Sequence, residues 1–120
     1  MKENNVVQRK SFDFAVGMVK LCRALADEKR EYILSKQLLR SGTSIGANVE
    51  EAIGGQSRRD FCAKLTIAYE EARETHYWLR LLQDAGILEP IVARKFMQDC
   101  EELLLILTSI LRTLKLKQNS

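Results

Sequence analysis

Apolar residues recur at intervals of three and four along four segments of the chain, which is the spacing of one helix face. The clearest stripe has the seam pattern of a helix packed in a bundle and comprises Ala93, Phe96, Cys100, Leu103, Leu107, Ile110 and Leu114. We expect helices over residues 8–27, 32–54, 58–85 and 90–116, within a single domain spanning 1–120. Because the connections are short, neighbouring helices should be antiparallel. The predicted fold is all-α, an antiparallel up-down-up-down four-helix bundle.

The first and third segments also indicate which residues should be buried and where helices should begin and end. The predicted core face of the first segment consists of Phe12, Ala15, Val19, Cys22 and Ala26, with Met18 and Leu25 beside it. In the third segment, Ser57 followed three residues later by Asp60 is a variant of the capping box, and Gly86 is a plausible C-cap. Only Thr75 interrupts the apolar stripe between them.

Glycines, hydroxyls and an asparagine interrupt the second segment, yet its apolar period continues through them. Gly42 and Gly46 lie four residues apart and should face one neighbouring helix, whose backbone or a large side chain could then approach closely. A phosphate-binding loop is the competing interpretation, but the required preceding strand and lysine are missing. Asn48 and Glu51 are expected to form a buried polar network that fixes the register of helices or subunits, with a direct ligand role as the alternative.

The net charge of +3 is concentrated at one end of the predicted bundle. That end should hold the start of the first helix, the junction of the second and third, and the end of the fourth. Its basic residues are Lys2, Arg9, Lys10, Arg58, Arg59, Arg112, Lys115 and Lys117, and its acidic residues are Glu3, Asp13, Glu50, Glu51 and Asp60. Nucleic acid would meet this end first. The alternative is a solvated end that keeps the protein soluble.

Some apolar residues lie off the predicted core stripes and suggest a second contact surface. Ile67, Trp78 and Leu81 share one side of the third helix, while Leu105 and Leu116 lie opposite the seam of the fourth. An apolar patch containing tryptophan is a common anchor in interfaces, so we expect self-association. Alternatively, wide helix faces could bury these residues within one chain.

The sequence contains no arrangement of side chains typical of catalysis or of metal and cofactor binding. Cys22, Cys62 and Cys100 are widely separated and sit among apolar residues, so they are predicted to be buried thiols. The single histidine, His76, has no cysteine at ligand spacing and no second histidine to complete a di-iron carboxylate pattern. A packed, hydrogen-bonded histidine is therefore favoured over a general base. We expect no enzymatic activity, no metal and no cofactor.

The ends and the apolar runs of the sequence bear on where the protein is found. The amino terminus has no apolar segment typical of a secretory signal. The longest apolar run, Leu103 to Leu111, is much shorter than the ~20 residues of a membrane helix. A cytoplasmic location with no membrane partner is expected.

The run SIGANVEEA from Ser44 to Ala52, the Asp60-Phe61 helix start and the YWL triplet at Tyr77 resemble the bacterial four-helix bundle proteins encoded within intervening sequences of 23S rRNA genes. These proteins are related to the accessory variability protein of diversity-generating retroelements. The resemblance implies a homo-oligomeric ring, with a pentamer favoured, and no known enzymatic activity. It also implies structured RNA or DNA, or a reverse transcriptase, as partners. Gly17 departs from the family, where a charged residue is expected.

Two functions from different classes follow from these observations. The first is a ring-forming nucleic-acid or ribonucleoprotein adaptor that uses the arginines and lysines of the basic end. The second is a structural scaffold that binds another protein through Trp78 and its neighbours. Their salt dependence distinguishes them, because polyanion binding weakens steeply as salt rises while apolar docking barely responds.

Overall fold

The computed structural model describes residues 2–118, and the surroundings of the side chains from residue 6 to 117. Four helices follow one another along the chain: α1 (Lys2–Lys29), α2 (Ile33–Ile53), α3 (Arg58–Asp84) and α4 (Pro90–Gln118). Residues 2–118 include no strand. The predicted all-α four-helix bundle is confirmed. α1 begins six residues earlier than predicted, at Lys2, and Val7 in this extra segment is only 1% exposed.

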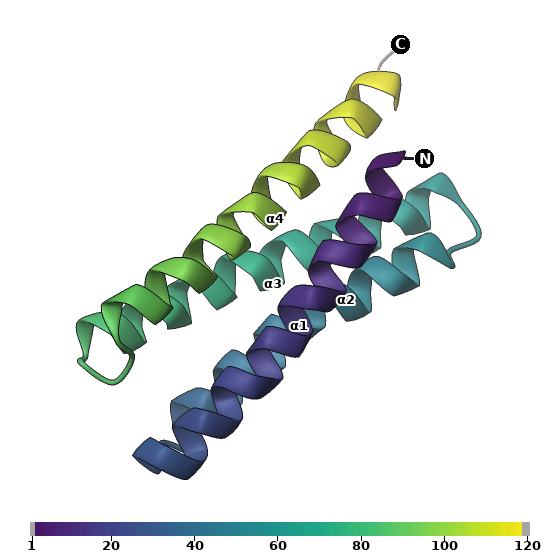
Figure 1. Cartoon of the computed structure of the whole chain (residues 1–120). Helices are drawn as coiled ribbons and strands as arrows, with labels where there is room; N and C mark the ends of the chain where they lie inside the picture. Colours follow the sequence, from purple (N-terminus) through teal and green to yellow (C-terminus); the bar gives the residue numbers. More distant parts are fainter. Residues whose placement is uncertain (1, 119–120) are drawn as a thin grey trace.

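The helices form an elongated molecule of 51 × 22 × 21 Å. Each helix packs against the next along the chain, and α1 and α4 close the bundle with the smallest contact among the neighbouring pairs. Figure 1 shows both ends of the chain and the turn between α2 and α3 at one end of the bundle. The last turns of α4 extend beyond the start of α1 (Figure 1). The juxtaposition expected from the short connections is therefore confirmed.

Local side-chain chemistry sets the helix ends. The Ser57 hydroxyl accepts a hydrogen bond from the Asp60 backbone N–H at 3.0 Å and caps α3, as predicted. Gly86, just after α3, has a φ of +76°, in the left-handed region that glycine adopts without strain. At the start of α2, which has no Ser, Thr, Asp or Asn cap, the Glu31 carboxylate accepts the Leu34 backbone N–H at 2.7 Å.

The buried face of α1 differs from the predicted one. Phe14, Met18 and Leu25 point into the core, each at most 5% exposed. Phe12 and Val19, which we expected there, are 63% and 39% exposed. α1 has apolar residues on two opposite sides, and the side that fits against α2 is the one containing Met18.

Gly42 and Gly46 on α2 both face α1. A Cβ atom added to Gly42 would lie 2.5 Å from Met18 Cγ, and one added to Gly46 would lie 3.2 Å from the backbone oxygen of Ser11. The two missing side chains therefore allow α1 to lie close against α2. Gly17 serves the same purpose on the other side of α1, because its added Cβ would meet the Phe96 ring of α4 at 2.9 Å.

The buried polar contact between helices differs from the one expected. Asn48 is half-buried and donates to the Ser44 carbonyl oxygen of its own helix at 2.8 Å. Glu51 is exposed and its carboxylate lies 3.6 Å from Lys64 Nζ. Within one chain the predicted Asn48–Glu51 network is therefore wrong, because both residues lie toward the solvent side of α2.

A hydroxyl pair joins α2 and α3 in the core instead. Thr75 Oγ1 and Ser41 Oγ are 2.9 Å apart, and both residues are fully buried. Thr75 also donates to the Glu71 carbonyl oxygen at 2.8 Å. In the sequence, this contact is indicated by Thr75, which interrupts an otherwise apolar stripe. The sequence does not indicate which of the several hydroxyl residues of α2 is the partner of Thr75.

A double-mutant cycle tests whether the hydroxyls of Ser41 and Thr75 stabilise the bundle as a pair. Thr75→Val or Ser41→Ala alone should lower the free energy of unfolding by about 1–2 kcal/mol, because each leaves a buried hydroxyl with fewer partners. The double variant should cost less than the sum of the two, since both polar groups are then removed. Urea denaturation measures all four proteins. Strict additivity would show that the contact contributes nothing.

Candidate nucleic-acid interface

Most of the cations predicted for the basic end are exposed at that end. Arg58 and Arg59 occupy the first turn of α3, where the positive end of the helix dipole adds to their charge. The exposed members of the set are Arg9, Arg58, Arg59, Arg112, Lys115 and Lys117. The side chains of Lys2 and Glu3 lie outside the described residues. The last turn of α4, which extends beyond the start of α1 (Figure 1), contains the exposed residues Lys115 and Lys117.

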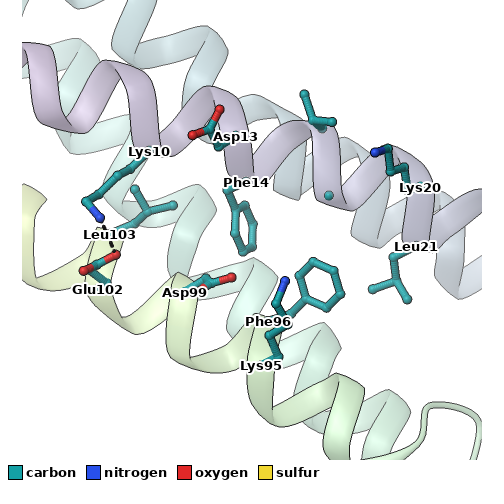
Figure 2. Close-up of a pocket in the computed structure, with 12 residues that line it drawn as sticks. Lys10, Asp13, Phe14, Lys20, Leu21, Lys95, Phe96, Asp99, Glu102 and Leu103 are labelled. Carbon is teal, nitrogen blue, oxygen red and sulfur yellow. Dashed lines mark hydrogen bonds and ion pairs between the residues drawn. The ribbon is translucent and has the colours of Figure 1, made fainter.

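Lys10 differs from the other predicted cations. Its Nζ lies 3.1 Å from the Glu102 carboxylate, half-way along α4 rather than at its end. Figure 2 shows this ion pair spanning the space between α1 and α4. The charge of Lys10 is therefore balanced by Glu102. The prediction that Lys10 belongs to the cations of the basic end is wrong.

Two of the acidic residues near the basic end, Glu50 and Glu51, have side-chain partners of their own. Gln8 Nε2 donates to the Glu50 carboxylate at 2.9 Å, and Glu51 pairs with Lys64. Glu51 and Asp60 line a shallow hollow beside the α2–α3 turn, on the side of α3 that faces α2. These carboxylates reduce the positive potential on that side, so the cations of α3 and α4 make up the more basic part of the end.

The apolar residues expected to form one contact surface lie on two sides of the molecule. Trp78 Nε1 donates to the Glu74 carboxylate at 3.0 Å, and Glu74 also pairs with Arg40 of α2. Trp78 therefore lies on the α2 side of α3, and it is partly buried against the core. Leu105 is 72% exposed and lines a groove with Tyr69 on the other side of α3.

Two of the remaining residues of the predicted contact surface are exposed, and α1 carries a further exposed apolar stripe. Ile67 and Leu116 are 39% and 66% exposed, and Leu81 is half-buried. On the outward side of α1, three exposed apolar residues follow one another at helical spacing: Phe12, Val16 and Val19. The sequence pattern does not reveal this stripe, because it predicts that Phe12 and Val19 lie in the core.

A groove of about 630 Å³ runs between α1 and α4. The rings of Phe14 and Phe96 meet edge to face on its floor, with centroids 6.3 Å apart. Asp13 and Asp99 lie on either side of Phe14, and Lys95 Nζ stands 5.2 Å from the centre of the Phe96 ring (Figure 2). The groove thus carries charges of both signs around an aromatic floor.

Cys100, His76 and Glu101 lie together between α3 and α4, in a set that superficially resembles a nucleophile, a base and an acid. His76 Nε2 lies 2.8 Å from the Glu101 carboxylate. Cys100, however, is fully buried, and its Sγ donates to the Ala72 carbonyl oxygen at 3.1 Å. Burial, with a smaller contribution from the Glu101 charge, raises the pKa of this thiol to about 12. Such a thiol stays protonated and is a poor nucleophile.

The three cysteines should therefore differ in reactivity. Burial raises the pKa of Cys22 to about 11, whereas Cys62 is partly exposed. A disulfide reagent at about pH 8 should label one thiol per native chain, and all three after denaturation, because thiolate and access are both required. Cys62→Ser should abolish the native labelling. Rapid labelling of Cys22 or Cys100 in the native protein would contradict this assignment.

Among the residues that the structure describes, no group of three or more His, Cys, Asp or Glu side chains could hold a metal ion. None of the four helices combines the length and apolar composition that crossing a membrane requires.

Fold and surface together define an antiparallel four-helix bundle with a cationic end and exposed apolar stripes. The family model of the 23S rRNA-intervening sequence protein matches residues 3–109. The chain belongs to this family, and the resemblance seen in the sequence is confirmed. A comparison with curated proteins gave no match.

A solved crystal structure has the same fold. It is a protein with unknown function from the S23 ribosomal protein family of Bacteroides thetaiotaomicron VPI-5482. The two chains share 46% sequence identity and superpose with a TM-score of 0.90, over 92% of this chain and 98% of that one. Neither the family description nor the description of this neighbour names an enzymatic activity.

Proposed function

We propose that the protein is a non-enzymatic bundle that assembles into a ring and binds structured RNA or DNA through its basic end. The observation that carries this proposal is the set of exposed cations at the start of α3 and along the last turns of α4, at one end of the molecule. Glu50 and Glu51, the acids nearest to them on α2, already have side-chain partners. The family description refers to a sequence within 23S rRNA, so RNA is the first ligand to test.

Self-association is supported by apolar side chains on different sides of the chain. Phe12, Val16 and Val19 face outward from α1, and Leu105 faces outward from α4. Two unlike surfaces that fit each other make a heterologous contact, and such contacts close into rings when the rotation between subunits permits. A ring would also bring the basic ends of several subunits together and raise the local positive potential. A pentamer is the number that the family resemblance favours.

The absence of catalysis rests on the chemistry of the described side chains. The thiol nearest to a histidine, Cys100, is buried and protonated. The floor of the groove between α1 and α4 is formed by Phe14 and Phe96, neither of which is a nucleophile or a base, and Lys10 at its edge is paired with Glu102.

The proposal is tested by binding of purified protein to a labelled structured RNA across a salt series. Binding through phosphates should weaken steeply as salt rises. RNA binding that is equal at low and high salt would refute contacts between the phosphates and the basic end. The scaffold function, in which Trp78 and its neighbours bind another protein, predicts no RNA binding at any salt concentration. No binding at low salt would refute the nucleic-acid function.

A further inference from the structure

An exposed tyrosine stands between two arginines on the outward side of α3. Tyr77 is 48% exposed. Arg73 precedes it by four residues and Arg80 follows it by three, so all three side chains share one side of the helix. Both arginines are exposed, and neither forms an ion pair or hydrogen bond with another described side chain. At 1.5 Å per residue, the two cations are spaced about 10 Å apart along the helix.

The Tyr77 ring is restrained by its contact with the neighbouring Trp78 ring. It meets the Trp78 ring edge to face, with centroids 5.1 Å apart and planes at 70°. Trp78 Nε1 donates to Glu74 at 3.0 Å, and Glu74 is in turn paired with Arg40 of α2. This chain of contacts fixes the aromatic ring before any ligand arrives, which lowers the entropy lost on binding.

Tyr77 lies on the same helix as Arg58 and Arg59 of the basic end. α3 begins with Arg58 and Arg59 at that end, and Arg73 follows about 21 Å further along the same helix. A nucleic acid held at the start of α3 can therefore extend along α3 to Tyr77. Two exposed acids, Glu70 and Asp84, flank this site, while Glu74 is occupied by Arg40 and Trp78.

From this geometry we propose that Tyr77, Arg73 and Arg80 bind an unpaired nucleotide. Tyr77 stacks on the base, and the two guanidinium groups contact the phosphates on either side of it. A fixed exposed aromatic ring beside cations is the usual device for binding single-stranded segments, because every base has a face that can stack. A paired base inside a duplex cannot offer that face. This inference rests on the proposed function and specifies it further: the preferred ligand has a single-stranded segment.

The test compares an RNA hairpin containing an unpaired loop with a blunt duplex of the same length. Tyr77→Ala should weaken hairpin binding by about 5- to 100-fold and leave duplex binding unchanged, since only an unpaired base can stack. Tyr77→Phe should bind like the unmodified protein. Tyr32→Ala is the matched control, because Tyr32 is also exposed, at 60%, but lies at the far end of the bundle.

The single tryptophan provides a second readout. Because Trp78 contacts Tyr77, adding an oligouridylate should change the tryptophan emission of the unmodified protein and of Tyr32→Ala. The change should be lost in the double variant Arg73→Gln, Arg80→Gln. Hairpin binding by Tyr77→Ala equal to that of the unmodified protein would overturn this inference. The proposed function would remain intact if Arg58→Glu with Arg59→Glu weakens binding by at least about tenfold. Failure of the unmodified protein to bind either RNA would overturn both.

Discussion

Gly42→Leu is expected to lower the free energy of unfolding by about 3 kcal/mol or more, the largest effect of any single substitution considered. A Cβ atom alone at this position would stand 2.5 Å from Met18 Cγ and 3.3 Å from Met18 Cβ. Met18 is fully buried, so its side chain has no free space to enter. A leucine would therefore force α1 away from α2. Urea denaturation followed by circular dichroism measures the loss.

Two controls separate this contact from the general properties of glycine. Gly54→Ala should be close to neutral, because the nearest atom to its added Cβ is 3.6 Å away. Gly42→Ala should destabilise the unmodified protein by about 1–2 kcal/mol, through overpacking against Met18. In a Met18→Ala background the same change should be stabilising, since the methyl group fills vacated space and alanine favours a helix by about 1 kcal/mol. Destabilisation in both backgrounds would contradict the account.

The second large effect concerns nucleic acid. Arg58→Glu combined with Arg59→Glu should weaken binding of structured RNA by at least about tenfold and flatten the salt dependence by about two phosphate contacts. Both side chains are exposed. Glutamates in the first turn of α3 interact favourably with the helix dipole, so the melting temperature should not fall.

A matched variant checks that the position of the charge matters as well as its amount. Lys20→Glu with Arg23→Glu changes the net charge equally, on exposed residues of α1 nearer the opposite end of the bundle. This variant should bind RNA almost as well as the unmodified protein at moderate salt, because distant charges are screened. Equal losses in the two double variants would show that binding depends on net charge alone.

The helices and their order followed from the sequence because each has a sustained apolar period and recognisable ends. Ser57 and Gly86 are examples in which one residue type satisfies one backbone requirement. The position of the basic end could also be predicted from the sequence. Short connections force consecutive helices to run antiparallel, which brings the start of α1, the α2–α3 turn and the end of α4 to the same end of the bundle. The helical period alone did not reveal which side of α1 is buried, because Phe12 and Phe14 lie on opposite apolar sides of the same helix.

Contacts between particular side chains were harder to predict than the helices themselves. The sequence does not determine the handedness of the bundle. It therefore does not determine which side of α3 faces α2 and which side faces α4. Trp78 and Leu105 were therefore joined in one surface, although Trp78 lies toward α2 and Leu105 lies beside Tyr69. The pairing of Lys10 with Glu102, 92 residues apart, depends on the same arrangement.

The measurement that tests the central claim most directly combines RNA affinity with the mass of the protein in one sample. Labelled structured RNA is titrated at about 50 mM and about 200 mM salt, where several phosphate contacts should change the affinity by orders of magnitude. Light scattering on the same sample gives the number of subunits. We predict a closed oligomer whose RNA affinity falls steeply with salt. A monomer, or an affinity that does not change with salt, would contradict a ring that binds nucleic acid through its basic ends.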